Sequence, residues 1–170
     1  MKLTFIKINL VLVLCLVLVA CDHNDEKFYS IPKDEIYAEY YKCDPGIHFL
    51  QSFLIIENDN DLKESMKIYE KIYSLPNFNY ILETYSLEYY TWFIGLVRID
   101  SPVDSISQKA LLIDKETSRV YTDCKYTYRE EVEDITYWVF YWVVEKDKLI
   151  NYDFTEQKKE AYSILKQEKE

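Results

Sequence analysis

Histidine and glycine, which many catalytic sites require, are scarce in this chain of 170 residues. The two histidines are His23 and His48, and the two glycines are Gly46 and Gly95. With so few glycines, the sequence contains no phosphate-binding loop, no dinucleotide-binding fingerprint and no nucleophile elbow. A Ser-His-Asp or Cys-His site would have to use His48, and no local motif around it supports one. We therefore assign no catalytic residue and expect a protein that is not an enzyme.

The acidic residues show no metal-binding pattern of the right spacing. From Asp59, acids stand at positions one, three and twelve of an EF-hand-like loop. Lys63 and Glu64 fill positions five and six, where an oxygen ligand and a glycine are needed. A zinc site through Cys43, Cys124 and a histidine would lack paired ligand spacing. The sequence predicts no bound metal and no cofactor.

Large aromatic residues concentrate in two stretches of the second half of the chain. On a sheet that helices cover, such residues form core, whereas on an open face they could stack against a sugar or a protein. Tyr137 and Tyr141 share one face of an expected strand, and we predict that their hydroxyl groups reach solvent. The aromatic residues are Tyr89, Tyr90, Trp92, Phe93, Tyr137, Trp138, Phe140, Tyr141 and Trp142.

An acidic segment, 130–134, leads directly into the second aromatic stretch. Paired carboxylates could serve a glycosidase, but neighbouring acids in a polar loop usually form a solvated turn. An acidic rim beside aromatic side chains also suits a protein partner with a basic surface, because charge steers the encounter and buried rings supply affinity. We expect an immunity-like, inhibitory or assembly protein, and the alternative is an aromatic pocket for a carbohydrate or envelope component. The predicted binding residues are Glu130, Glu131, Glu133, Tyr137 and Tyr141.

The amino-terminal residues predict export. Lys2 and Lys7 come first, and the stretch that follows, Leu10 to Ala20, carries no charge. As a helix this stretch would span about 16 Å, roughly half of a ~30 Å hydrocarbon core, so a permanent membrane span is not expected. A basic start, a short apolar core and a small residue before a boundary are typical of a secretory signal peptide.

The boundary Leu18-Val19-Ala20-Cys21 resembles the lipobox of bacterial lipoproteins. In that family the cysteine sulfur receives a diacylglyceryl group, the leader is removed before it, and the new amino terminus is fatty acylated. The resemblance implies a leader at residues 1–20, a lipid on Cys21 and a flexible tether at 21–31. Because two or more acyl chains hold a protein stably at a membrane, it also implies a protein anchored in the bacterial cell envelope.

The residues after Cys21 leave open which membrane carries the anchor. Asp22, directly after the cysteine, resembles the signal that retains some lipoproteins at the inner membrane. The acidic run of Asp22, Asp25 and Glu26 also resembles the surface-export tether of some Bacteroidota lipoproteins. The two resemblances imply different faces of the envelope, and the sequence does not choose between them.

The formal net charge of the chain is −10. Without residues 1–20, which contain two lysines and no acid, 18 basic and 30 acidic residues remain, a charge of −12. Nucleic-acid binding is not expected, since contacts to phosphates need clustered cations. The same charge disfavours lying flat on anionic lipid, so the expected membrane contact is the covalent lipid. After the tether, residues 32–170 have a length that suits one domain.

Two cysteines, Cys43 and Cys124, remain when the leader and the anchor are set aside. Export would place them where disulfides persist, so we predict a bond between them. Closing a loop of this length would stabilise the fold by roughly 4 kcal/mol in the chain-entropy model. Two separate buried thiols are the alternative.

The first half of the domain predicts helices. The aromatic patch 36–41 suits one or two helical turns, and 47–57 suits either a helix or a buried strand. The clearest helix is 61–75, where Asp61 begins a capping-box pattern and an apolar stripe follows. At the other end of the chain, Thr155 is expected to cap an amphipathic final helix.

The second half predicts strands. The stretch 88–99 suits a strand in which Gly95 marks a bulge or sharp bend. A hairpin joins 110–113 to 119–122. The strongest strand is 135–145, which is apolar on both faces, as in a sheet covered on both sides. The predicted class is therefore α+β, with amino-terminal helices, a curved antiparallel sheet and a carboxy-terminal amphipathic helix.

The stretch 110–121, ALLIDKETSRVY, resembles the Asp-Lys-x-Thr-Gly-x-Val-Tyr hairpin of small NTF2-like and immunity-type domains. Ser118 stands where that pattern has glycine, which a left-handed turn position favours. Such hairpins recur in unrelated folds, so what the resemblance implies most directly is the hairpin itself.

Overall fold

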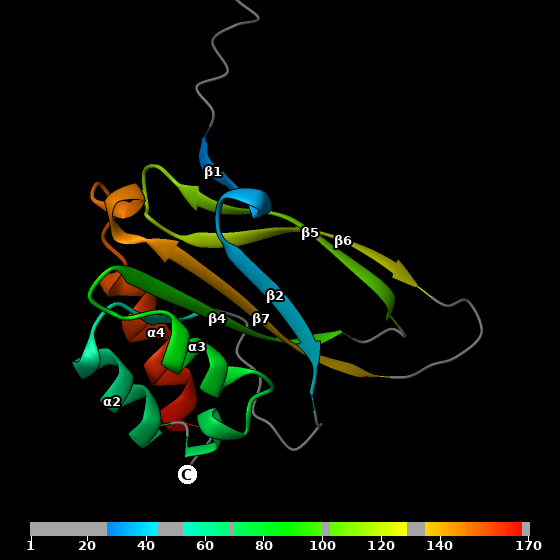
Figure 1. Ribbon diagram of the computed structural model, residues 1–170, viewed down its shortest axis with the longest axis horizontal. Coiled ribbons are helices and arrows are strands. Elements are labelled where there is room, and N and C mark those ends of the chain that lie inside the picture. The colour runs from blue at the N-terminus through cyan, green and yellow to red at the C-terminus, as the bar shows by residue number, and fades with distance from the viewer. Residues whose placement is uncertain (1–26, 44–52, 69, 100–102, 129–134, 168–170) are drawn as a thin grey trace, which may run out of the picture.

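A computed structural model describes residues 27–43, 53–68, 70–99, 103–128 and 135–167. Two antiparallel sheets dominate these residues, and short helices accompany them (Figure 1). The three-stranded sheet has the order β1-β5-β6, and the four-stranded sheet has the order β2-β7-β4-β3. The strands are β1 (Phe28–Pro32), β2 (Tyr37–Lys42), β3 (Phe53–Ile56), β4 (Tyr90–Ile99), β5 (Val103–Asp114), β6 (Val120–Tyr128) and β7 (Thr136–Glu145). The helices are α2 (Asp59–Ile68), α3 (Phe78–Thr84) and α4 (Thr155–Gln167), with 3-10 turns η1 (Lys33–Glu35), η2 (Glu70–Ser74) and η3 (Lys146–Leu149).

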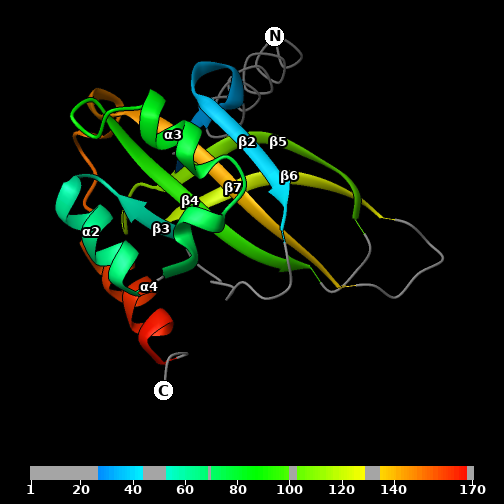
Figure 2. The same cartoon turned by 60° about the horizontal axis from the view of Figure 1, so that its bottom comes forward.

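The four-stranded sheet is the middle of three layers. One face packs against the helices, and the other packs against the three-stranded sheet (Figure 2). The core under the helices contains Trp92 and Tyr141, whereas the core between the sheets contains Phe93, Trp142 and Leu111. Alternate residues of β4 and β7 enter opposite cores, as the two-residue period of a strand requires.

The prediction of a strand at 135–145 that is covered on both faces is confirmed by β7. This strand pairs with β2 on one side and with β4 on the other. Val139 and Trp142, one from each face, are fully buried. Burial of apolar side chains on both faces fixes β7 in the centre of its sheet.

The predicted amino-terminal helices are wrong, and the α+β class is wrong with them, because the described residues form a mainly-β fold. Residues 36–41 lie almost entirely in β2, which pairs with β7. Residues 53–56 form β3. Tyr37 and Tyr41 pack against the core under the helices, whereas Ala38 packs against the core between the sheets. This two-residue alternation gives both faces of the strand a core to enter.

The helix predicted at 61–75 is confirmed in part, because α2 ends at Ile68 and η2 follows. Asn58 caps α2: its Oδ1 accepts hydrogen bonds from the N–H groups of Asn60 at 2.9 Å and Asp61 at 3.1 Å. The Asp61 carboxylate instead accepts a hydrogen bond from the N–H of Glu57 at 3.0 Å. The helix therefore begins at Asp59 with Asn58 as its cap, two residues before the predicted start at Asp61.

The amphipathic final helix is confirmed as α4. The Asp153 carboxylate accepts a hydrogen bond from the N–H of Thr155 at 2.9 Å, so Asp153 supplies a cap in place of Thr155. Ala161 and Leu165 are buried, whereas Lys159 faces solvent. The helix thus packs on the domain by one apolar face.

The bulge predicted at Gly95 is not found. β4 pairs with β7 in unbroken register through Gly95, and the register shifts lie in β5, at 103–105 and 108–110. Gly95 admits the ring of Phe53, since a Cβ at this position would lie 3.0 Å from Phe53 Cε1. Because glycine has no Cβ, the Phe53 ring can pack directly against the backbone at this position.

The hairpin predicted across 114–118 is confirmed, and its strands are longer than predicted. Ser118 has φ of 55°, in the left-handed region that glycine would enter at no steric cost. The side chain of Asp114 organises the turn. Its Oδ1 accepts hydrogen bonds from the N–H groups of Glu116 and Thr117, both at 3.0 Å.

Replacing Asp114 by asparagine is expected to remove a pH-dependent part of the stability. The bond from the Thr117 N–H, with help from the ammonium of Lys27, lowers the pKa of Asp114 from 3.8 to about 2. Because the folded state holds the carboxylate charged, this contribution is present above the unfolded pKa and is lost as pH falls through the folded pKa. Urea unfolding of wild type and Asp114→Asn should show a stability difference at about pH 6 that shrinks toward pH 2. A difference that is the same at both pH values would contradict this role.

The predicted disulfide between Cys43 and Cys124 is absent from the structure. Cys43 follows β2 and packs against the core under the helices, whereas Cys124 lies in β6 of the other sheet. Because the two cysteines belong to different layers, their sulfur atoms do not meet. The alternative of two separate thiols describes the structure.

Candidate functional site

The residues predicted to do chemistry or binding lie in different settings. Tyr137 is partly buried near the start of β7. Tyr141 is 1% exposed, and its hydroxyl donates a hydrogen bond to the carbonyl of Pro76 at 2.7 Å. The prediction that Tyr141 reaches solvent is wrong, because its face of β7 lies under the helical layer. The residues outside the described part of the chain are Cys21, His23, His48, Glu130, Glu131 and Glu133.

A different group of tyrosines gathers where β2 meets α3. The ring centroids of Tyr37 and Tyr85 are 5.0 Å apart, and those of Tyr85 and Tyr90 are 5.4 Å apart. Tyr80 lies 6.0 Å from Tyr37 and 6.3 Å from Tyr85. These rings meet at tilted or edge-on angles, which aromatic pairs favour over face-to-face stacking. We call Tyr37, Tyr41, Tyr80, Tyr85 and Tyr90 the tyrosine surface.

Asn77 connects the two parts of the tyrosine surface. Its backbone has φ of 64°, a left-handed conformation that asparagine tolerates. Its Nδ2 donates hydrogen bonds to the hydroxyl oxygens of Tyr37 at 2.9 Å and Tyr41 at 2.8 Å. Burial, together with the neighbouring Tyr41 hydroxyl, raises the pKa of Tyr37. The Tyr37 hydroxyl therefore stays protonated, and Asn77 orders β2 against the start of α3.

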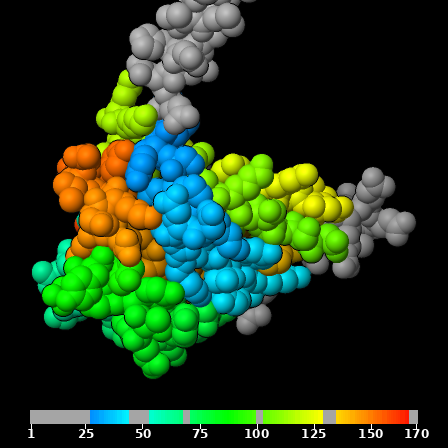
Figure 3. Space-filling view, turned by 45° about the horizontal axis from the view of Figure 1, so that its top comes forward, coloured from blue at the N-terminus to red at the C-terminus, as the bar shows by residue number. Residues whose placement is uncertain are grey.

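Part of this surface is open to solvent. Tyr80 is 45% exposed, and Leu82 and Tyr89 on the same stretch of chain are 37% and 61% exposed. In the space-filling view, β2 and α3 form adjoining parts of one face (Figure 3). Several large apolar side chains exposed together mark interaction surfaces in many soluble proteins.

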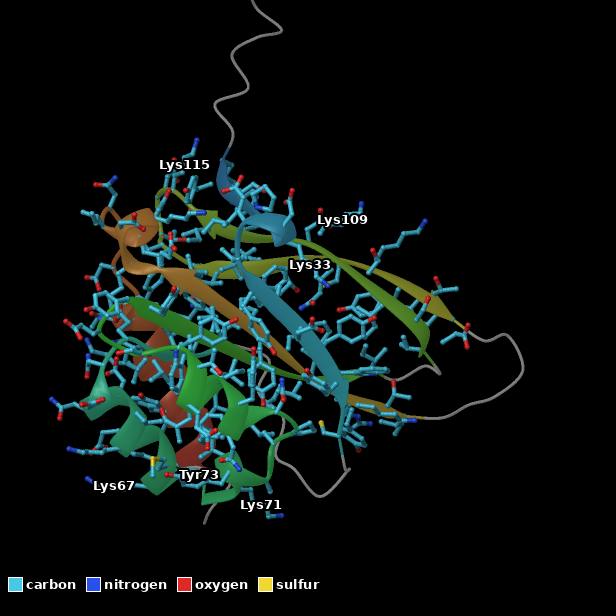
Figure 4. The ribbon with its side chains drawn as sticks, viewed as in Figure 1. Lys33, Lys67, Lys71, Tyr73, Lys109 and Lys115 are labelled. Atoms are coloured by element: carbon cyan, nitrogen blue, oxygen red, sulfur yellow. The ribbon has the colours of Figure 1, made fainter. Side chains whose placement is uncertain are left out.

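The stretch that supplies most of the tyrosine surface is acidic. No lysine or arginine occurs between Lys71 and Arg98, whereas Glu83 and Glu88 are both exposed. Lys146 reaches this stretch, and its ammonium donates a hydrogen bond to a backbone carbonyl at 2.6 Å. Other lysines lie away from this stretch in Figure 4. Lys67 and Lys71 belong to α2 and η2, and Lys33, Lys109 and Lys115 lie on the side of the four-stranded sheet that faces the three-stranded sheet.

A second aromatic group lies between the two sheets, and we call Tyr40, Gln108, Trp138 and Trp142 the inter-sheet cluster. The rings of Tyr40 and Trp138 are 5.9 Å apart, and the Tyr40 hydroxyl donates a hydrogen bond to the Ile106 carbonyl at 2.7 Å. Gln108 is 5% exposed. Its Oε1 and the Nε1 atoms of Trp138 and Trp142 are buried without a hydrogen-bond partner among the described residues. One acceptor and two donors are therefore left over in this layer.

Cys124 and Tyr126 of β6 lie near the inter-sheet cluster, since Cys124 is opposite Gln108 in the strand register. Burial raises the pKa of the Cys124 thiol. Burial, with Cys124 nearby, also raises the pKa of Tyr126 to about 12. A thiol with a raised pKa carries little thiolate at neutral pH, so Cys124 is a poor nucleophile.

Searches for a metal site, a membrane-spanning helix and similar proteins add no further evidence on function. Among the described residues, no three or more His, Cys, Asp and Glu side chains are grouped so that they could hold a metal ion. Within the same ranges, no helix has the length and apolar character needed to cross a membrane. No protein family, curated protein or solved structure matches this chain. The features from which a function can be inferred are the lipobox, the tyrosine surface and the inter-sheet cluster.

The tyrosine surface was not predicted from the sequence. Tyr37 and Tyr41 lie 40 and 36 residues before Asn77, so no local spacing links these residues. The signal that the sequence does offer is composition. The chain contains 17 tyrosines, and because an apolar core has little use for their hydroxyl groups, some of them are expected at the surface.

Proposed function

We propose that this protein is lipid-anchored in the bacterial cell envelope and has a non-catalytic role, binding another protein as an immunity-like, inhibitory or assembly factor. The lipobox Leu18-Val19-Ala20-Cys21 supports the anchor. The tyrosine surface supports the binding role, and it is the observation that carries the proposal. Glu130, Glu131 and Glu133 lie outside the described residues and add no support here.

Tyrosine suits protein recognition for two physical reasons. Its ring offers a large apolar contact area with few rotatable bonds, and its hydroxyl can hydrogen-bond at the rim. In this protein Asn77 already holds Tyr37 and Tyr41 in place, which lowers the entropy lost on binding. Tyr80 is exposed beside these ordered rings and can act as an anchor.

The partner that fits this surface is basic. Glu83 and Glu88 are exposed on the stretch that carries Tyr80, Tyr85 and Tyr90, and this stretch has no lysine or arginine of its own. An arginine of the partner can stack its guanidinium on a tyrosine ring and pair with a nearby carboxylate. We therefore expect a protein that presents arginine or lysine side chains.

The first described strand after the anchor residue, β1, and the tyrosine surface lie on opposite sides of the four-stranded sheet. Cys21 precedes the start of β1 at Phe28 by so few residues that the chain between them spans at most about 25 Å. β1 is part of the three-stranded sheet, whereas α3 covers the opposite face of the four-stranded sheet (Figure 1). A lipid on Cys21 would hold the three-stranded sheet near the membrane and leave the tyrosine surface accessible to a partner.

Replacing Tyr80 by alanine is expected to weaken partner binding tenfold or more, because truncating an anchor tyrosine commonly costs about 2 kcal/mol. The full-length protein is solubilised in mild detergent, and the proteins captured by each variant are quantified by mass spectrometry. Tyr121→Ala is a matched control, since Tyr121 is 43% exposed but lies on β6.

A basic protein that is captured by wild type and by Tyr121→Ala, but lost with Tyr80→Ala, would support the proposal. Its affinity should also fall as salt concentration rises, because surface charges steer the encounter. Equal capture by all three proteins would contradict a role of the tyrosine surface.

A ligand-binding role of the inter-sheet cluster is the second candidate, and the unpaired atoms Gln108 Oε1, Trp138 Nε1 and Trp142 Nε1 favour it. Neutral sugars present hydroxyl groups that both donate and accept hydrogen bonds, and their apolar faces stack on indole rings. Titration with neutral sugars should change the tryptophan fluorescence of wild type but not of Gln108→Leu. No change with any sugar would contradict this candidate.

A further inference from the structure

The outer edge of β6 is closed at its first residue. In an antiparallel strand, the N–H and C=O groups of one residue point to the same side, and those of alternate residues point to opposite sides. The Val120 N–H donates a hydrogen bond to Gln157 Oε1 at 2.9 Å, and Gln157 Nε2 donates one to the Val120 carbonyl at 3.4 Å. The side-chain amide of Gln157, on α4, therefore occupies the place of a neighbouring strand beside Val120.

Beyond Val120 the same edge is open in the described structure. Thr122, Cys124 and Tyr126 point their backbone groups to the same side as Val120, because the extra residues of both register shifts belong to β5. β6 is the last strand of its sheet among the described residues. No backbone hydrogen bond joins these three residues to another described element. Such a row of unpaired groups is a template for a further strand.

We propose that β6 of a second copy of the chain occupies this edge, antiparallel to the first and centred on Cys124. In this register the two Cys124 residues exchange both backbone hydrogen bonds. Thr122 of each copy exchanges the same pair of bonds with Tyr126 of the other. Val120 lies just beyond the paired stretch, where Gln157 already binds its backbone. The two three-stranded sheets then continue as one sheet through a two-fold axis.

The side chains of β6 select this register. Asp123 of each copy lies directly opposite Lys125 of the other, so the favourable pair occurs twice by symmetry. Asp123 is half-buried and Lys125 is exposed, and neither has an ion-pair partner among the described residues. Shifting the second copy by two residues keeps the hydrogen-bonding phase but places Asp123 opposite Asp123, or Lys125 opposite Lys125. Like charges directly opposite are unfavourable, so both alternatives are disfavoured.

Charge reversal tests the proposal on the full-length lipidated protein in a non-ionic detergent. Sedimentation equilibrium at matched detergent density gives the dimer dissociation constant at physiological salt. Wild type should dimerise, and Asp123→Lys and Lys125→Asp should each weaken the dimer by roughly tenfold or more, since two attractive pairs become repulsive. Circular dichroism should show the same fold for all variants, because both side chains lie at the solvent-facing side of the strand.

An equimolar mixture of Asp123→Lys with Lys125→Asp should restore wild-type affinity, because each mixed pair is again of opposite charge. The double variant Asp123→Lys/Lys125→Asp should also dimerise as wild type does. A monomeric wild type would overturn the proposal and assign Lys125 the role of keeping the edge unpaired. Single variants that dimerise as tightly as wild type, or a mixture that stays monomeric, would overturn it too.

Discussion

Replacement of Cys21 by serine is expected to move the protein from the membrane fraction to the soluble fraction. A serine hydroxyl cannot take the place of the thiol in forming the thioether that carries the lipid. Each buried CH₂ of an acyl chain contributes about 0.8 kcal/mol, so losing two or more chains should lower the membrane-bound share by far more than tenfold. Metabolic labelling with a fatty acid should mark wild type and leave Cys21→Ser unlabelled.

Cys15 provides a matched control, because it lies in the expected leader and should not reach the mature protein. Cys15→Ser should therefore remain labelled and membrane-bound. If unlabelled Cys21→Ser stays on the membrane as well as wild type does, the lipobox interpretation is wrong.

Replacement of Lys158 by methionine is expected to lower the free energy of unfolding by roughly 2 to 3 kcal/mol, since it leaves two carboxylates without their counter-ion. The Lys158 Nζ lies 2.7 Å from Glu57 Oε2 and 2.9 Å from Asp61 Oδ2. These contacts join α4 to the end of β3 and to α2. Burial alone would lower the pKa of Lys158, but its bonds to Glu57 and Asp61 outweigh burial and raise it. The side chains keep some contact with water, so the expected loss stays below that of a fully buried pair.

Urea unfolding at neutral pH measures this loss, with Lys159→Met as the control. Lys159 is the next residue of α4 and pairs with Glu156 one turn away, where both side chains are largely exposed. Lys159→Met should leave the unfolding free energy unchanged within error. Equal stability of the Lys158 and Lys159 variants would show that the Lys158 contacts do not hold α4 in place.

The strands of the second half were predictable because their signal is local. Residues 135–145 are apolar on both faces, and only a covered central strand gives both faces a core. The first half misled because Tyr37, Tyr40 and Tyr41 have the spacing of one helical face as well as that of a strand. What decided the outcome is pairing with β7, about a hundred residues later in the chain, and no local pattern encodes it.

The same limit applies to the sites. The two hydroxyl groups of Tyr137 and Tyr141 on one face of the strand favour a solvent-facing site, whereas the apolar character of both faces predicts cover on both sides. The cover decides the outcome for Tyr141, which the helical layer buries. The tyrosine surface depends on Asn77 reaching from the start of α3 to Tyr37 of β2, a contact that exists only once the layers have packed. Cys43 and Cys124 could be paired by elimination only, and packing places them in different layers.

Site-specific photo-crosslinking in intact cells is the sharpest test of the protein-binding role. A photoreactive phenylalanine analogue replaces Tyr80 or, in a parallel strain, Tyr121, in the full-length protein with Cys21 intact. We predict that the probe at Tyr80 captures one basic envelope protein and that the probe at Tyr121 does not capture it. The same partner captured equally from both positions, or from Tyr121 alone, would contradict a partner surface built on the tyrosines of β2 and α3.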